Sequence, residues 1–184
     1  MRQVAITGTR STGHRSLDAY GDLFMTYLGP FADDAHFFIG GASGIDSMAL
    51  VWLAGNTAAE LTVVVPGTVD QQPADARQAI ARARDRIKQV VELKATELGT
   101  PAYHARNRWM VDHASMTIGF PHAIEPSTGT WQTLDYTAEQ RKWRVGNPPT
   151  RPGRTNATNS SSPTCTRALR PARSRSAPAP TSLS

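Results

Sequence analysis

The chain has 184 residues, with 20 Lys and Arg against 15 Asp and Glu, a length that fits one domain with a tail. Six arginines and no acidic residue follow Gly146, which leaves 14 basic and 15 acidic residues before it. The first 146 residues are therefore near neutral, which excludes a basic nucleic-acid footprint spread over the whole domain.

Residues 147–184 differ sharply in composition from the rest. They hold seven of the 13 prolines, are rich in Ser, Thr and Ala, and have only Leu169 and Leu183 as large aliphatic residues. Such a segment cannot bury enough apolar surface to fold. We expect one domain over residues 1–146 and a disordered basic tail over 147–184, to which no function is given.

The single cysteine, Cys165, lies in this tail, so neither a disulfide framework nor a cysteine metal site is expected. The five histidines lack the spacing of metal ligands. No apolar run reaches the roughly 18 residues of a membrane span. We expect a cytoplasmic protein with no metal, no cofactor and no membrane contact.

Short β-branched runs alternate with segments of helical period along the first 146 residues. Strands are predicted at 3–7, 36–40, 60–66, 90–95 and 115–120, with an edge strand at 142–145. Helices are predicted at 16–28, 44–55, 76–89, 101–114 and 130–141. Thr100 is predicted to cap the fourth helix, which then begins with Pro101. This alternation predicts an α/β fold, a Rossmann-like three-layer αβα domain with a mostly parallel sheet.

Three loops that follow strands combine glycine with hydroxyl side chains, at the edge where open parallel sheets bind ligands. In chain order, their candidate residues are Gly8, Thr9, Arg10, Ser11, Gly41, Ser43, Gly44, Ser127, Gly129 and Thr130. Glycine lets the backbone approach a ligand, and the free N–H groups of a helix's first turn favour an anion. The sequence therefore predicts a phosphate-binding site at this edge of the sheet.

Charged and amide side chains extend this site. Arg10 follows a strand end and is expected to contact phosphate, and Arg106 and Asn107 are further candidates on a helix. Asp46 lies in the first turn of its helix, where it either stabilises that helix or binds a ribose hydroxyl or a base. Neither a G-x-G-x-x-G fingerprint nor a Walker lysine motif is present, which disfavours NAD and P-loop nucleotide hydrolysis.

The motifs "VAITGTRS", "GGASGIDSMAL", "VVVPGTVDQQP", "ARNRWM" and "STGTWQTLDYTAE" occur in series over about residues 3–145. In order and spacing they resemble the SLOG superfamily, which groups DprA/Smf DNA-processing proteins with LOG nucleotide-processing proteins. Small DprA-like phage and actinobacterial members are the most similar. The resemblance implies a Rossmann-like fold that binds a nucleotide, or the phosphates of single-stranded DNA, at these loops.

One departure bears on activity. Arg106, Asn107 and Met110 match an element of the LOG phosphoribohydrolases, but the glutamate credited with their chemistry falls at Thr133, which cannot act as a carboxylate acid or base. We therefore favour a module that binds a nucleotide, a nucleotide-derived ligand or single-stranded DNA. A LOG-like N-glycoside hydrolase acting on nucleoside monophosphates remains the alternative, and a homodimer remains open.

Overall fold

The structure is a computed structural model that describes residues 1–122, 128–146 and 165–166. Its strands are β1 (Arg2–Gly8), β2 (Ala35–Gly40), β3 (Glu60–Val65), β4 (Ile87–Glu92), β5 (Met116–Phe120), β6 (Trp143–Gly146) and β7 (Cys165–Thr166). Its helices are α1 (Leu17–Tyr27), α2 (Ile45–Asn56), α3 (Ala74–Arg82), α4 (Thr100–His113) and α5 (Gly129–Glu139). Short 3-10 helices lie at Gly29–Phe31, Val69–Gln71 and Arg84–Arg86. None of the helices in the described ranges is long and apolar enough to cross a membrane.

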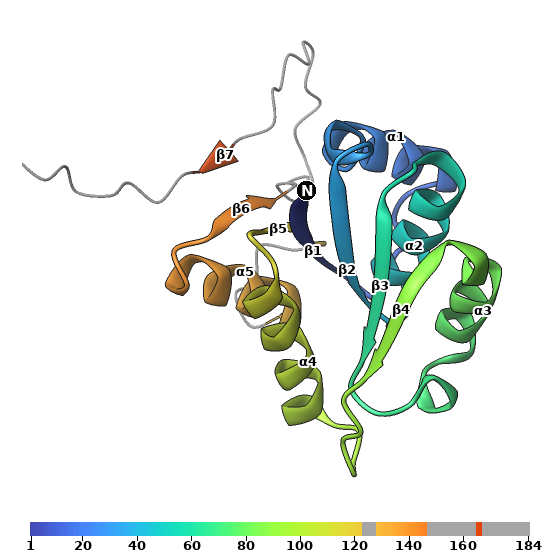
Figure 1. Cartoon of the computed structure of the whole chain (residues 1–184), viewed down its shortest axis with the longest axis vertical. Helices are drawn as coiled ribbons and strands as arrows, with labels where there is room; N and C mark the ends of the chain where they lie inside the picture. The colour runs from blue at the N-terminus through green and yellow to red at the C-terminus, as the bar shows by residue number, and fades with distance from the viewer. Residues whose placement is uncertain (123–127, 147–164, 167–184) are drawn as a thin grey trace, which may run out of the picture.

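The helices cover both faces of one sheet. Figure 1 shows α1, α2 and α3 on one side of the sheet and α4 and α5 on the other. Side chains alternate along β1, so that Val4 and Ile6 join the larger core cluster, which also contains side chains of α1 and α2. Ala5 points to the opposite face and joins a smaller cluster with Met110 and Ala114. The predicted αβα layering is therefore confirmed.

The strand order β4-β3-β2-β1-β5-β6-β7 places β1 between β2 and β5. All neighbours are parallel except β6 and β7, which pair antiparallel. From β1 the chain runs through β2, β3 and β4 on one side of β1, and it then crosses to the other side, where β5 lies. The strand order therefore reverses between β1 and β5, which makes this boundary a topological switch point. Gly8 at the end of β1 is in register with Phe120 at the end of β5. Ligand sites in open α/β sheets form beyond such a boundary.

The predicted end of one helix and the predicted N-cap of another are wrong. The helix predicted over 76–89 ends at Arg82 as α3, and Ile87 already begins β4, because Ile87 pairs with Leu61 of β3. Thr100 does not cap α4, since it is the first helical residue and Gly99 occupies the N-cap position without a side-chain bond.

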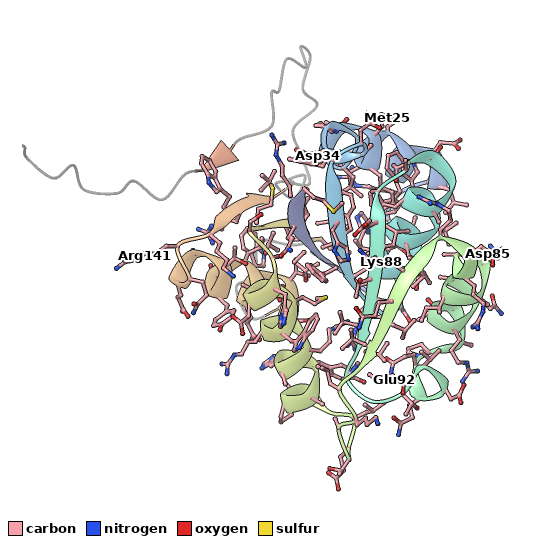
Figure 2. All side chains as sticks on the ribbon, in the orientation of Figure 1. Met25, Asp34, Asp85, Lys88, Glu92 and Arg141 are labelled. Carbon is pink, nitrogen blue, oxygen red and sulfur yellow. The ribbon has the colours of Figure 1, made fainter. Side chains whose placement is uncertain are left out.

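The two edges of the sheet differ. Lys88 and Glu92, both labelled in Figure 2, lie on the edge strand β4. Lys88 donates to Glu60 at 2.6 Å and Glu92 accepts from the Val69 N–H at 2.9 Å, and charged side chains on an edge strand discourage pairing with another chain. On the other side, the predicted edge strand is present as β6, and the two-residue β7 pairs with it.

Candidate functional site

A cleft of about 650 Å³ opens beyond the carboxyl ends of β1 and β5. Its walls come from the loop after β1, the loop and first turn after β2, one face of α4, and the start of α5. The lining residues are Thr7, Gly8, Thr9, Arg10, Ser11, Ala42, Asp46, Thr100, Tyr103, His104, Arg106, Asn107, His122, Thr128, Gly129, Thr130 and Gln132. Nine of the predicted site residues are in this set, so the structure gathers most of them at one place.

The loop after β1 is fixed by hydrogen bonds on both sides. The Thr9 N–H donates to the Phe120 carbonyl at 3.1 Å, and the Thr9 carbonyl accepts from the Ile45 N–H at 3.1 Å. Within the loop, the Thr9 hydroxyl accepts from the Ser11 N–H at 3.1 Å, a local turn typical of threonine. The segment that carries Arg10 is therefore held against β5 and α2 before any ligand binds.

Arg10 lies at the cleft wall with its guanidinium over the Tyr103 ring, 4.6 Å from the ring centroid. A cation above an aromatic face is attracted to its negative charge density. The contact restricts the long Arg10 side chain while leaving it exposed. Arg10 is thus a positioned cation at the mouth of the cleft.

Asp46 and Arg106 form a buried ion pair in the cleft lining, although each is only 5 % exposed. Arg106 Nη1 lies 3.4 Å from Asp46 Oδ2, and Arg106 Nε, which is also buried, has no hydrogen-bond partner among the described residues. Gly40 makes room for the pair, because a Cβ there would overlap the Arg106 guanidinium and lie 2.7 Å from Asp46 Oδ2. The pair is therefore tightly enclosed but incompletely hydrogen-bonded.

Burial governs the ionisation of this pair. It raises the pKa of Asp46 to about 7, against the opposing effects of Arg106, Arg10 and a hydrogen bond with the Ala42 backbone. Burial likewise lowers the pKa of Arg106, and Asp46 opposes that shift. Asp46 is the sole carboxylate among the described lining residues. Because it is only partly ionised near neutral pH, the cleft carries net positive charge and favours an anion.

The start of α5 supplies backbone donors to the same cleft. Thr128 is the N-cap, and its hydroxyl accepts from the Trp131 N–H at 3.5 Å. No described residue accepts a hydrogen bond from the N–H of Gly129 or Thr130, and both residues line the cleft. Free N–H groups in a first helical turn, together with the helix dipole, form an anion-binding arrangement.

Asn107 reaches the cleft beside α5 and is held there by Thr133. Asn107 Nδ2 donates to the Thr133 hydroxyl at 2.8 Å, and that hydroxyl donates to the Gly129 carbonyl at 2.7 Å. Thr133 is 3 % exposed. The Thr133 hydroxyl therefore already joins α4 to the first turn of α5.

Three predicted site residues that the structure describes do not line the cleft. Ser43 donates to Asp75 of α3 at 2.8 Å, which turns it away from the cleft. Gly41 packs against Val65, since a Cβ there would lie 2.6 Å from Val65 Cγ1. Gly44 has a φ of 80° and allows the two loops to touch, because a Cβ there would meet the Thr9 carbonyl oxygen at 2.5 Å. Ser127 lies outside the described residues.

Sequence reasoning did not single out the remaining lining residues, which are Thr7, Ala42, Thr100, Tyr103, His104, His122, Thr128 and Gln132. Helical spacing was a usable signal for two of them. Tyr103 precedes Arg106 by three positions and Asn107 by four, and Thr100 lies one turn further back, which places them on neighbouring parts of one helix face. His122 follows β5, and no periodicity marks it.

Within the described ranges, no group of three or more His, Cys, Asp and Glu side chains is placed to hold a metal ion. The arrangement offers instead one exposed arginine, one buried arginine, free backbone donors and several hydroxyls. Such a set can bind an anionic group and hydrogen-bond to a polar ligand attached to it.

No family model matches the chain, and no curated protein matches it. The solved structures that are similar to it include two of DNA processing protein A (DprA). The protein from Streptococcus pneumoniae aligns with a TM-score of 0.65 and 19 % identity, over 83 % of this chain and 52 % of that one. The Helicobacter pylori protein, whose structure concerns its single-stranded DNA binding mode, aligns with a TM-score of 0.60 and 19 % identity, over 83 % of this chain and 67 % of that one. This chain therefore spans about half the length of the first of these proteins and has the DprA-like, Rossmann-type fold.

Proposed function

We propose that the cleft binds a nucleotide unit through its phosphate, either as a free nucleotide or within single-stranded DNA. The observation that carries the proposal is the convergence on one cleft of Arg10, the Arg106 guanidinium and the N–H groups of Gly129 and Thr130, which have no acceptor among the described residues. A phosphate is the common biological group that matches two guanidinium cations and a helix N-terminus at once.

The location and the comparison support the same proposal. The cleft lies at the switch point of a parallel sheet, where nucleotides bind in related architectures, and the similar H. pylori structure concerns binding of single-stranded DNA. The cleft lining also contains Tyr103, His104 and His122, whose rings provide surfaces on which a base can stack. A ligand with phosphate and base therefore fits better than an inorganic anion alone.

The alternative of N-glycoside hydrolysis is less well supported. Thr133, which stands at the position of the LOG glutamate, is buried and bonded to Asn107. Glycoside hydrolysis canonically needs two carboxylates, whereas Asp46 is the single carboxylate in the described lining and is paired with Arg106. We therefore propose binding without turnover.

Equilibrium titration tests this proposal, with AMP, CMP, GMP, UMP and a short oligothymidylate as ligands. We expect saturable binding of at least one of them, which Gly129→Val weakens strongly, because a branched side chain then stands where the backbone approaches the anion. A Cβ at Gly129 meets no described atom within 4 Å, so the first carbon of the new side chain has room in the described fold. Chromatography of the same mixtures should detect no free base. Release at about 0.1 per second or faster, lost in a cleft variant, would establish the enzyme instead.

A further inference from the structure

We propose that Asp46 is the ligand-linked proton acceptor of the cleft, so that an anion binding beside Arg10 and Arg106 is bound together with a proton that Asp46 takes up from solvent. The proposal rests on the proposed function, because it requires a phosphate in the cleft. It adds a chemical consequence that the fold alone does not imply: the affinity for the anion depends on pH through one buried carboxylate.

The geometry couples Asp46 to the anion site through Arg106. The two side chains are almost completely buried, their nearest charged atoms are 3.4 Å apart, and both belong to the cleft lining. The Arg106 guanidinium makes this one long contact with the Asp46 carboxylate, and its Nε has no hydrogen-bond partner among the described residues. Arg106 can therefore act as counter-charge to a second anion without leaving its place.

The arriving charge changes which protonation state of Asp46 is favoured. Arg10 and Arg106 both stabilise the Asp46 carboxylate in the free protein. A phosphate that pairs with these arginines neutralises part of that support and adds negative charge within the same low-dielectric cleft. Two adjacent anions in such a site are disfavoured, so Asp46 takes up a proton to become a neutral acid. No bond other than its new O–H bond forms, and the proton comes from water or buffer.

The groups that act on Asp46 and Arg106 come from several neighbouring segments. Arg10 comes from the loop after β1, Arg106 and Tyr103 come from α4, and the Ala42 backbone comes from the loop after β2. On the α3 side, Asp75 accepts from Ser43 in the same loop.

Two histidines of the cleft are rival proton acceptors. His104 and His122 both line the cleft, and the His122 ring lies 3.8 Å from the His14 ring, centroid to centroid. The pKa of His14 is lowered by burial and by the neighbouring His122 and Arg15. An experiment must therefore separate uptake at Asp46 from uptake at this histidine group.

Calorimetric titration with a short oligothymidylate measures the proton directly. This probe has phosphodiesters that do not titrate near neutral pH, whereas a phosphate monoester has an ionisation near pH 6 that would obscure the result. The full chain is titrated in Tris and in HEPES at about pH 8, and the difference in heat gives the protons taken up. We expect about half a proton or more per bound ligand.

The pH dependence has a definite sign. Because the pKa of Asp46 is about 7 in the free protein, Asp46 is already protonated well below that pH and no further uptake occurs there. Above it, the free carboxylate must be protonated on binding, so the affinity falls by up to about tenfold per pH unit. An affinity that is flat or rises above pH 7 would overturn the proposal.

Variants identify the acceptor. Asp46→Asn should abolish the uptake, whereas His104→Asn and His122→Asn should leave about the same number of protons. Loss of uptake in a histidine variant, with retention in Asp46→Asn, would overturn the proposal. If Asp46→Asn does not fold, the side-chain carboxyl resonance of Asp46 in wild-type protein gives the same answer, because its pKa must rise when the oligothymidylate binds. Binding with no uptake contradicts this proposal alone, and absence of any binding contradicts the proposed function as well.

Discussion

Arg10 shows how one exposed side chain can be prepared for a ligand. Its guanidinium rests over Tyr103, and its loop is bonded to Phe120 and Ile45 on either side. Restricting a long side chain before binding reduces the entropy lost on binding. Arg10 could be predicted as a site residue from its position after a strand. Its contact with Tyr103 could not be predicted, because the two residues meet only through the tertiary fold.

Replacement of Arg10 tests its role. We expect Arg10→Ala to weaken binding of the nucleotide or oligothymidylate by about 1.5 to 3 kcal/mol, the range for hydrogen bonds to charged groups. Arg2→Ala is a matched control, because Arg2 also stacks on an aromatic ring, that of Phe31 at 5.6 Å, and it does not line the cleft. Calorimetry that shows equal affinities for the two variants would remove Arg10 from the site.

The Asp46–Arg106 pair joins residues 60 positions apart, so no local sequence spacing predicts it. Asp46 could be placed from the sequence in the first turn of a helix, but its burial and its partner depend on how α4 packs across the sheet. A buried ion pair gains little net stability, because desolvation of both charges offsets their attraction. Its position next to the cleft fits the ligand-linked role proposed above.

The stability contributed by Asp46 should depend on pH. Its pKa is about 7 in the folded chain and about 3.9 in an unfolded one. A raised pKa means that the folded state binds the extra proton, so this contribution is complete below about pH 4 and is lost as pH rises through about 7. Relative to Asp46→Asn, the wild type should lose about 2 kcal/mol of unfolding free energy between about pH 5 and pH 7.

Urea unfolding of both proteins at the two pH values provides the measurement. The titrations of His14, His36 and Glu60, whose pKa values are all lowered in the fold, are common to both proteins and cancel in the comparison. A difference between wild type and variant that stays constant with pH would show that Asp46 is ionised normally.

At the scale of elements, local patterns account for most of the fold but not for all boundaries. Apolar stripes and β-branched runs predicted the order of strands and helices up to β6. They misjudged the end of α3, because Ile80, Ala83 and Ile87 fit a helical stripe while Ile87 also fits a strand. Ile87 lies in a strand because it pairs with Leu61 of β3. Pairing partners cannot be identified from a single sequence.

The last residue of β2, Gly40, has no space for a side chain beside the Asp46–Arg106 pair. A Cβ at Gly40 would overlap the Arg106 guanidinium, so we expect Gly40→Ala to destabilise the fold by about 1 to 3 kcal/mol and to weaken anion binding. Gly21→Ala is the matched control. Gly21 lies inside α1 with no atom within 4 Å of a Cβ, and alanine there should stabilise the fold by about 0.5 to 1 kcal/mol. Chemical unfolding that ranks the two variants in the opposite order would contradict this account of Gly40.

At the scale of the whole molecule, all residues of the two described core clusters lie within residues 1–146, and the described residues beyond that range are the two of β7. We propose that residues 1–146 are the domain that folds independently. Among the described residues, a chain truncated after Gly146 loses only the short pairing of β7 with β6, and it should melt within about one or two degrees of the full chain. A much larger fall in the melting temperature by calorimetry would place the domain boundary later.

The whole-molecule architecture explains why the predicted loops meet. A parallel sheet brings the carboxyl ends of β1, β2 and β5 to one edge, so loops far apart in sequence converge without any local signal beyond their composition. The same architecture separates Ser43 and Gly41 from the cleft, since the loop after β2 turns towards α3 and β3. Composition predicted most of the loops that line the cleft, but which of their side chains face the cleft depends on the packing of the loop after β2 against α3 and β3.

The most direct measurement of the central claim is a titration of amide-labelled protein with a short oligothymidylate, followed by the N–H resonances. We expect the largest shifts at Gly129 and Thr130, whose donors are free in the described structure, and at Thr9 and Arg10 in the facing loop. Amides of Gly21 and Lys88, on α1 and β4 away from the cleft, should remain unchanged. Saturable binding that shifts other amides and leaves Gly129 and Thr130 unmoved would contradict the proposed site.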